Sequence, residues 1–128
     1  MTVNQILSSK GKEVYSVLST NTVFEALTIM SEKNIGAILV IENAVLKGIL
    51  SERDYARKIV LKDKSSKDAL VKEIMVSEVI CIKPSDNLDY CMELMNTKKI
   101  RHLPVLDNNA VVGIISISDV VKAIIEIQ

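Results

Sequence analysis

The stretch Gly48-Ile49-Leu50-Ser51-Glu52-Arg53-Asp54 occurs again 65 residues later, as Gly113-Ile114-Ile115-Ser116-Ile117-Ser118-Asp119. Both copies contain a glycine, two large aliphatic residues, a serine, two further residues and an aspartate, and an apolar helical run follows each. An ungapped comparison of residues 14–60 with residues 79–125 gives 11 identities in 47 positions. Ordinary residue frequencies predict about three or four. The chain therefore contains an internal repeat.

The composition favours one soluble domain with an aliphatic core. The chain has 128 residues, of which 48% are hydrophobic, and it holds one Phe, three Tyr and no Trp. Its 16 basic and 16 acidic side chains give a formal net charge of zero, which argues against a nucleic-acid surface that works by phosphate neutralisation. No signal peptide is visible, and no apolar run reaches the roughly 18 residues of a membrane helix. We therefore expect a cytoplasmic protein.

Hydrophobic spacing predicts the order β-α-β-β-α in the first copy, after a short helix over residues 2–9. The predicted strands cover residues 13–18, 37–41 and 45–51. A helix capped by Ser19 or Thr20 lies between the first two strands, and it buries a stripe formed by Val23, Ala26, Leu27 and Met30. A second helix covers residues 52–61, and its predicted inward residues are Tyr55, Ala56, Ile59 and Val60.

The same order is predicted in the second copy, after a helical segment over residues 69–75. Strands are predicted over residues 79–83, 102–106 and 110–117, and a last helix over residues 118–127. The intervening helix starts at Pro84 and Ser85, and its stripe consists of Leu88, Cys91, Met92 and Met95. Pro104 has no amide hydrogen, so we expect its strand at a sheet edge or in a local bend.

Neither set of five short elements can bury an aliphatic core of this size alone. We therefore predict an α/β (α+β) fold in which two tandem β-α-β-β-α repeats pack together with approximate two-fold symmetry. The first repeat covers about residues 1–61 and the second about residues 69–128. The charged residues 62–68 form an exposed connection, and residues 1–128 make up one module.

Each copy of the repeated stretch has a glycine inside a predicted strand. Glycine weakens a strand, but it lets another backbone or a ligand come close. Gly48 and Gly113 are therefore expected at points of close approach.

The serine and the aspartate of each copy have two interpretations. Ser51 and Ser116 stand at a predicted helix start, where unpaired amides and the helix dipole favour a phosphate. Asp54 and Asp119 follow within the first turn, and a carboxylate can accept hydrogen bonds from both hydroxyls of a ribose. In the alternative, the serine caps the helix and the aspartate offsets its dipole. One copy alone favours the alternative, and the duplication favours a nucleotide.

The chain resembles a pair of CBS (cystathionine-β-synthase) domains over nearly all of its length. The family's β-α-β-β-α unit closes with Gly-aliphatic-aliphatic-Ser/Thr-x-x-Asp, which residues 48–54 and 113–119 match. An aliphatic-x-x-aliphatic-Pro-Val strand also belongs to the pattern, and residues 100–105 match it. Leu39 stands in the first copy where the family often has Pro. Residues 51–58, with residues 101–105, are similar to small stand-alone bacterial CBS-pair proteins.

The resemblance implies a module that binds adenine nucleotides in clefts between the two repeats. In such pairs the Ser-x-x-Asp of one copy faces the middle strand of the other, with Asp on the ribose and Ser near the phosphate. Carried over to this sequence, the first implied site consists of Ser51, Arg53, Asp54, Arg101, His102 and, against the base, Ile80. The second implied site consists of Ser116, Ser118, Asp119, Gly36, Ala37 and Tyr15.

Charge distinguishes the two implied sites. The first presents Arg53 and Arg101, with His102 beside them, and arginine is suited to bidentate contacts with phosphate. The second presents hydroxyls and small residues with no matched arginine. We therefore expect the first site to prefer charged phosphate groups. The second should bind more weakly, or take a ligand whose polar part lies elsewhere.

The remaining reactive side chains do not indicate catalysis. His102 is the only histidine, and a lone histidine is more often structural; beside Arg101, a phosphate contact is about equally expected. Cys91 on an apolar stripe and Cys81 in a strand are expected as free core thiols rather than a disulfide or a nucleophile. One His and two distant Cys do not give metal-ligand spacing. Tyr15 either stacks on a base or lies on the strand surface.

We predict a non-enzymatic regulatory module, of the kind used in energy sensing, with no catalytic residue and no catalytic cofactor. It binds AMP, ADP, ATP or NAD(H) and passes that state to an unidentified regulated protein. The apolar last helix fits a homodimer contact, and neither nucleic acid nor a membrane is an expected partner. One alternative is an interaction scaffold with empty clefts. A less favoured one is a small nucleotide-handling enzyme with Asp54 or Asp119 as its base.

Overall fold

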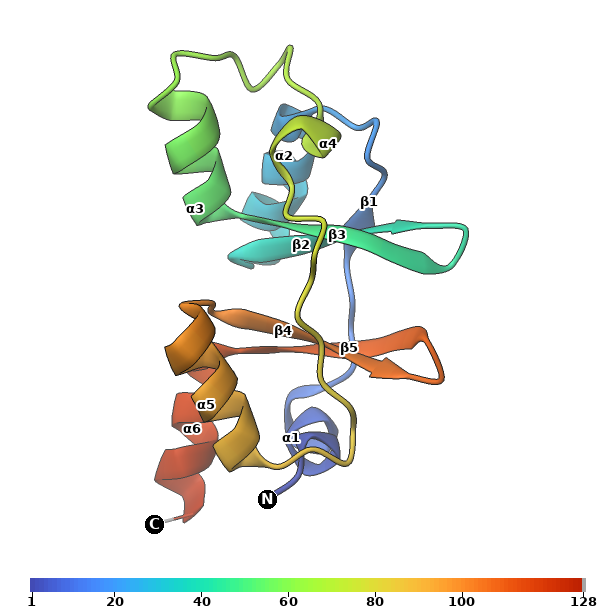
Figure 1. Ribbon diagram of the computed structural model, residues 1–128, viewed down its shortest axis with the longest axis vertical. Helices are drawn as coiled ribbons and strands as arrows, with labels where there is room; N and C mark the ends of the chain where they lie inside the picture. Colours follow the sequence, from blue (N-terminus) through green and yellow to red (C-terminus); the bar gives the residue numbers. More distant parts are fainter. Residues whose placement is uncertain (128) are drawn as a thin grey trace. The chain divides into compact units, whose positions relative to one another are not determined.

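The computed structural model describes residues 1–127 and divides into two compact units. Gln128, the last residue of the predicted second repeat, lies outside the described residues. One unit is the continuous stretch Tyr15–Val79, and the other combines Met1–Val14 with the chain from Ile80 onward. We refer to them as the continuous unit and the discontinuous unit. Each is a mixed α+β structure built around a small sheet (Figure 1).

The continuous unit follows the predicted element order. Its elements are β1 (Ser16–Val17), α2 (Val23–Lys33), β2 (Ala37–Glu42), β3 (Val45–Ser51), α3 (Glu52–Tyr55), η1 (Ala56–Val60) and α4 (Val71–Ile74). β1 pairs with β2 in parallel and β2 pairs with β3 antiparallel, which gives the sheet order β1-β2-β3. The predicted first repeat thus supplies the whole sheet of this unit.

The discontinuous unit contains the second copy, and its sheet has two strands. Its elements are α1 (Val3–Lys10), α5 (Leu88–Lys98), β4 (His102–Asp107), β5 (Ala110–Ser116) and α6 (Ile117–Ile127). α1 contacts β5 and α6. Each unit therefore contains the sheet of one repeat and the short helix that precedes the other repeat in the sequence.

The two hairpins share one register, which confirms the duplication at the level of strand pairing. The equivalent Cα partners are Ala37 with Ser51 and Val40 with Gly48 in one hairpin, and His102 with Ser116 and Val105 with Gly113 in the other. A bulge follows the glycine pair in both. Both two-residue turns have positive φ throughout, as in a type I′ turn; the residues are Asn43, Ala44, Asn108 and Asn109.

Pro104 shortens the strand pairing of the second repeat. In the first repeat the amide of Leu39 donates to the carbonyl oxygen of Tyr15 at 3.4 Å, and β1 pairs with β2 over two residues. Pro104 stands 65 residues after Leu39 and has no amide hydrogen to donate to Ile80. The predicted strand over residues 79–83 is therefore reduced to one parallel bridge, between Ile82 and Val105.

The α2 helix begins later than predicted because another residue caps it. Thr22 is the N-cap, and its hydroxyl oxygen accepts a hydrogen bond from the Glu25 amide at 3.1 Å. Ser19, one of the two predicted caps, instead donates its hydroxyl hydrogen to the Glu42 carboxylate at 2.9 Å. The other predicted cap, Thr20, lies outside the helix.

The α5 helix also begins later than predicted, at Leu88 instead of at Pro84 and Ser85. The carboxylate of Asp86 accepts a hydrogen bond from the Lys83 amide at 2.7 Å and holds this segment in a turn. Asn87 then caps the helix.

The helix predicted over residues 52–61 changes type halfway. α3 gives way to the π-helical turn η1, in which the amide of Leu61 donates to the carbonyl oxygen of Ala56, five residues back. A π turn holds more residues than an α turn, so it rotates the following side chains. Ile59 is buried as predicted, but Ala56 and Val60 are exposed, so the prediction that they point inward is wrong.

Each unit has its own core, and both cores are aliphatic as predicted. In the continuous unit the core includes Val23, Ala26, Met30, Leu50 and Ile59. In the discontinuous unit it includes Val3, Leu7, Cys91, Leu103 and Ile115. β3 is exposed at Val45 and Lys47 and buried at Gly48 and Leu50. Within residues 1–127, no helix is long and apolar enough to cross a membrane.

Candidate functional site

The first Ser-x-x-Asp motif, residues 51–54, lies where β3 passes into α3. Ser51 is the N-cap of α3, and its hydroxyl accepts a hydrogen bond from the Asp54 amide at 3.2 Å. Oδ2 of Asp54 accepts in return from the Ser51 amide at 3.0 Å and from the Ser51 hydroxyl at 2.9 Å. The motif is therefore a reciprocal capping box, which fixes the orientation of the Asp54 carboxylate.

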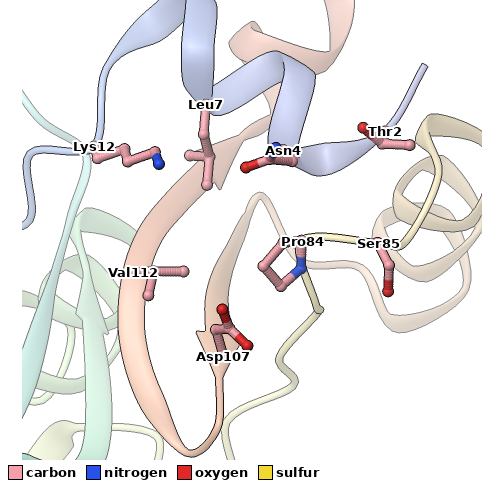
Figure 2. Close-up of a pocket in the computed structure, with 8 residues that line it drawn as sticks. All are labelled: Thr2, Asn4, Leu7, Lys12, Pro84, Ser85, Asp107 and Val112. Carbon is pink, nitrogen blue, oxygen red and sulfur yellow. The ribbon is translucent and has the colours of Figure 1, made fainter.

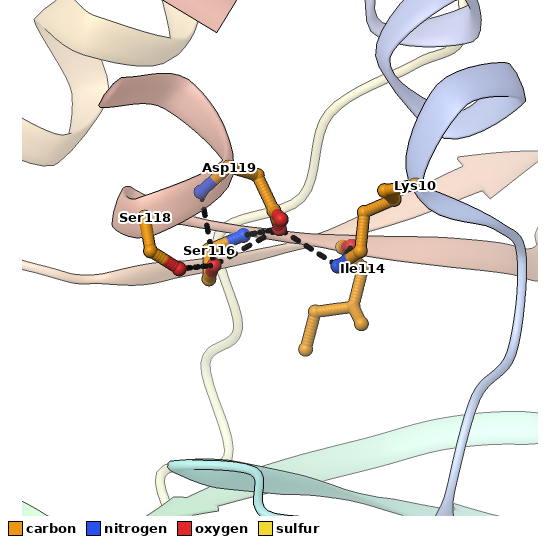
Figure 3. A network of polar contacts seen from close by, with 5 residues as sticks. All are labelled: Lys10, Ile114, Ser116, Ser118 and Asp119. Atoms are coloured by element: carbon orange, nitrogen blue, oxygen red, sulfur yellow. Dashed lines mark hydrogen bonds and ion pairs between the residues drawn. The ribbon is translucent and has the colours of Figure 1, made fainter. Parts of the chain in front are cut away.

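The second motif, residues 116–119, has the same geometry where β5 passes into α6 (Figure 3). Oδ2 of Asp119 accepts from the Ser116 amide at 2.7 Å and from the Ser116 hydroxyl at 2.9 Å. The Asp119 amide donates to the Ser116 hydroxyl oxygen at 3.3 Å. The hydroxyls of Ser116 and Ser118 lie 2.8 Å apart in a further hydrogen bond. Helix capping, the structural alternative considered for these residues, is thus present in both copies.

Several amides at the two helix starts already have partners in the protein. The amide of Glu52 donates to the Gly36 carbonyl at 3.1 Å, and that of Ile117 donates to the Arg101 carbonyl at 2.8 Å. The amides of Asp54 and Asp119 are bonded within the capping boxes. Sequence reasoning expected unpaired amides here as the phosphate site. A phosphate at either motif must therefore depend more on hydroxyls and cationic side chains.

Each aspartate also has a lysine partner that sequence reasoning missed. Lys58 Nζ lies 3.2 Å from Asp54 Oδ1 and donates to the Ile74 carbonyl at 2.9 Å. Lys10 Nζ lies 2.7 Å from Asp119 Oδ2 and donates to the Ile114 carbonyl at 2.7 Å. Lys58 could have been found from its i,i+4 spacing to Asp54. Lys10 comes from α1, far from Asp119 in the sequence, and only its place in the last turn of a helix marks it.

The other predicted site residues divide between the two units. The continuous unit holds Tyr15, Gly36 and Ala37 together with the first motif and Arg53. Ala37 is buried and lies opposite Ser51, and the ammonium of Lys33 lies 5.2 Å from the centre of the Tyr15 ring.

The discontinuous unit holds Ile80, Arg101 and His102 together with the second motif and Ser118. Ile80 packs partly buried against the core of this unit, and Arg101 is exposed. The assignment of these residues to two nucleotide sites stays a prediction.

His102 is partly buried at the start of β4. Burial lowers the pKa of His102 below its usual value, and the positive charges of Lys10 and Arg101 lower it further, while Asp119 opposes them. The imidazole is therefore neutral at pH 7. A neutral His102 can still donate one hydrogen bond to a phosphate, but it brings no charge.

This pKa makes folding sensitive to mild acid. Below the unfolded value of 6.5, the unfolded chain binds a proton at His102 that the folded chain does not. Stability is therefore complete above pH 6.5 and falls by up to about 1.4 kcal/mol per pH unit on acidification, until the folded pKa is reached. We expect the His102→Gln variant to lose this pH dependence of stability. Denaturant unfolding of both proteins above and below pH 6.5 measures it. An equal pH slope in both proteins would contradict the assignment.

A surface hollow of about 440 Å³ lies elsewhere in the discontinuous unit (Figure 2). It is lined by Thr2, Asn4, Leu7, Lys12, Pro84, Ser85, Asp107 and Val112. None of the predicted site residues is among them. The hollow is therefore separate from the motif chemistry.

The thiols and the metal-binding residue types form no reactive centre in residues 1–127. Cys81 and Cys91 do not form a disulfide. Burial, with a smaller effect of Asp86, raises the pKa of Cys91 to about 11, and burial also raises the pKa of Cys81. Within the same residues, no three His, Cys, Asp or Glu side chains are grouped to hold a metal ion.

Two units in one chain, each with an equivalent β-hairpin and the same capped Ser-x-x-Asp motif where the last strand passes into a helix, define a tandem-repeat α+β protein. A family model described as the CBS domain matches residues 4–61 and again residues 71–126. The chain therefore belongs to the CBS family and is a pair of CBS domains. Such pairs are regulatory modules, in agreement with the predicted class.

Related sequences and solved structures are similar over most of the chain. The CBS domain-containing protein YhcV of Bacillus subtilis is 35% identical over 91% of this chain and 83% of its own length. The mitochondrial protein CBSX3 of Arabidopsis thaliana is 36% identical, and the match covers 97% of this chain but only 65% of CBSX3.

Among solved structures, a protein with CBS domains from Burkholderia ambifaria MC40-6 has a TM-score of 0.97 and 46% identity, over 100% of this chain and 96% of its own. The CBS domain pair of protein MJ0100, in complex with 5′-methylthioadenosine and S-adenosyl-L-methionine, has a TM-score of 0.88 and 25% identity. That match covers 100% of this chain and 98% of the other.

Proposed function

We propose that this CBS pair is a non-enzymatic regulatory module that binds an adenosine-containing ligand, AMP, ADP, ATP or NAD(H), at its Ser-x-x-Asp motifs. The observation that carries the proposal is the duplicated carboxylate. In both motifs one oxygen is held by the same capping box, so the carboxylate is already oriented before a ligand arrives. An oriented acceptor is well suited to the two hydroxyls of a ribose. The adenosine compounds bound by the MJ0100 pair add support from a relative.

Ligand screening tests this proposal directly. Thermal shift followed by calorimetry should give a stabilising response to at least one of AMP, ADP, ATP and NADH, because a ligand that binds only the folded state raises its stability. S-adenosyl-L-methionine belongs in the same screen. No response to any of them at millimolar concentration would overturn the proposal, and turnover of ATP or NADH would overturn its non-enzymatic part.

The capping boxes also support a second candidate, an interaction scaffold whose motifs bind no ligand. Ser51 and Ser116 each accept a capping hydrogen bond without a ligand, and Lys58 and Lys10 already neutralise the two aspartates. This candidate predicts an unchanged melting temperature with every nucleotide. The same screen therefore separates the two candidates.

We propose that the module forms a homodimer through α6. Val120 and Ala123 of this helix are buried in the core and Ile124 packs partly buried against it, while Ile117, Val121, Ile125 and Ile127 are exposed. The side chain of Ile125 is 68% exposed, and the side chains of Val121 and Ile127 are also exposed. An apolar stripe of this kind on a short helix is typical of a protein contact.

We expect Ile125→Glu to weaken the homodimer at least about tenfold, because a charge placed in an apolar contact is left unpaired. Sedimentation velocity over a range of concentrations measures the effect. Val45→Glu is the matched control, since Val45 is also an exposed apolar residue but lies on β3. A wild-type chain that sediments as a monomer at all concentrations would contradict the homodimer.

A further inference from the structure

We propose that Lys10 is the residue that makes the second motif selective for a ligand carrying a phosphate. The inference rests on the proposed function, because it concerns the ligand of that same motif. It also changes the expectation from the sequence, in which the second site offers hydroxyls and small residues with no matched arginine. The structure brings a cation to this motif from α1.

Lys10 is held in place by two acceptors in the same unit. Its ammonium lies 2.7 Å from Oδ2 of Asp119 and 2.7 Å from the carbonyl oxygen of Ile114 (Figure 3). The Lys10 side chain is 29% exposed and that of Asp119 is 17% exposed. An ammonium fixed by a carbonyl and a carboxylate loses little further freedom when a ligand arrives, in contrast to a lysine that extends into solvent.

The hydrogen bonds to Asp119 use only one of its two carboxylate oxygens, which leaves the other for a ribose. Both Ser116 donors and Lys10 bond to the same oxygen of Asp119, Oδ2. None of these three bonds uses Oδ1. In the first motif the lysine instead lies on Oδ1 of Asp54, so a ribose at that oxygen would compete with Lys58. Lys10 therefore neutralises Asp119 without covering the oxygen that a ribose would use.

A phosphate at the second motif needs this cation. The amides of Ile117 and Asp119 are already bonded within the protein, so the start of α6 offers less to an anion than a bare helix end. Without Lys10, the charge of Asp119 would repel a nearby phosphate. Burial tends to raise the pKa of Asp119, but the hydrogen bond from Lys10, the bonds from Ser116 and the charge of Lys10 outweigh it and lower this pKa. The charge of Lys10 also lowers the pKa of His102, after the larger effect of burial.

The test compares adenosine with AMP, which differ by the phosphate alone. In calorimetry, the Lys10→Met variant should bind AMP at least about tenfold more weakly than the wild-type chain does at one of the binding events. The affinity for adenosine should change less than about threefold, because a neutral ribose depends on Asp119 and not on the cation. Lys10→Arg keeps the charge and should restore most of the preference for AMP.

Lys12→Met is the matched control. Lys12 is exposed, lies two residues further along the chain and undergoes the same change in charge. It should leave the ratio of AMP to adenosine affinity unchanged. An equal loss for both ligands in Lys10→Met would show a purely structural role and overturn the inference, as would an unchanged affinity for AMP. If Lys10→Met fails to fold, an unchanged AMP preference in Lys10→Gln overturns it equally. A wild-type chain that binds neither AMP nor adenosine also overturns the inference, whereas the proposed function itself is refuted only if ADP, ATP and NADH fail to bind as well.

Discussion

Replacing Gly48 with alanine is expected to lower the free energy of unfolding by about 1–3 kcal/mol, the usual cost of forcing an extra methyl group into a packed site. A Cβ at this position would lie 2.9 Å from the carbonyl oxygen of Val76 and 2.8 Å from the sulfur of Met75. This carbonyl is part of a β-bridge: the Val76 amide donates to the Ile49 carbonyl at 2.9 Å, and the Val76 carbonyl accepts from the Ile49 amide at 3.0 Å. It cannot move away without breaking this bridge.

Urea unfolding of the purified protein measures the loss. Lys47→Ala, at the exposed neighbouring position, is the control and should stay within about 0.5 kcal/mol of wild type. Gly113→Ala should cost less than Gly48→Ala, because its Cβ would meet only the side-chain atoms of Leu7, the nearest at 2.6 Å. A Gly48→Ala chain as stable as wild type would contradict the close approach at this glycine.

Asp54→Ala should remove most of the nucleotide affinity of the first motif. Hydrogen bonds to a charged group contribute roughly 1.5–3 kcal/mol each, so loss of the ribose acceptor should weaken AMP binding at one event by about 10–100-fold. The Asp54 side chain is only 14% exposed, and its oxygens also hold Ser51 and Lys58. A stability loss of about 1 kcal/mol should therefore accompany the loss of affinity.

Glu52→Ala separates the two effects. Glu52 is exposed in the same first turn and carries the same charge, but it takes no part in the capping box. Calorimetry should show AMP affinity within about threefold of wild type for this control, a change of less than 1 kcal/mol. If folded Asp54→Ala binds AMP as well as wild type does, Asp54 is a cap and nothing more.

The duplicated parts of the structure could be predicted from the sequence. The alignment of residues 48–54 with residues 113–119 fixes equivalent positions, and both hairpins have the same register and the same bulge. The turn after each middle strand follows from Asn43 and Asn108, which tolerate positive φ. Local pattern was sufficient here because each copy supports the interpretation of the other.

The predicted start of a helix was wrong where several neighbouring residues could each serve as its N-cap. Ser19, Thr20 and Thr22 can all cap a helix, and the choice depends on Glu42, which lies more than twenty residues away and takes the Ser19 hydroxyl. The π turn at Ala56–Val60 has no periodicity of its own in so short a segment. Both outcomes depend on tertiary contacts that a local pattern does not contain.

The sequence predicted the serine and aspartate of each motif, but it did not predict the lysines that pair with the aspartates. Ser51, Asp54, Ser116 and Asp119 follow from the repeated motif. Lys10 does not, because 109 residues separate it from Asp119 in the sequence and α1 has no counterpart that places a lysine in this way on Asp54. The two motifs acquire their lysines from unrelated elements, so the repeat alone could not reveal them.

The assignment of chain segments to units has a consequence for the order in which the molecule is made. All of the contacts within Tyr15–Val79 join residues of one uninterrupted stretch, so this unit can close while later residues are still on the ribosome. Met1–Val14 cannot pack into its unit at that stage, because the residues that it packs against begin at Ile80. Until they emerge, Val3, Ile6 and Leu7 have no core to enter, and closing such a long loop slows the step further. The segment that precedes the continuous unit in the chain is thus expected to pack later than that unit does.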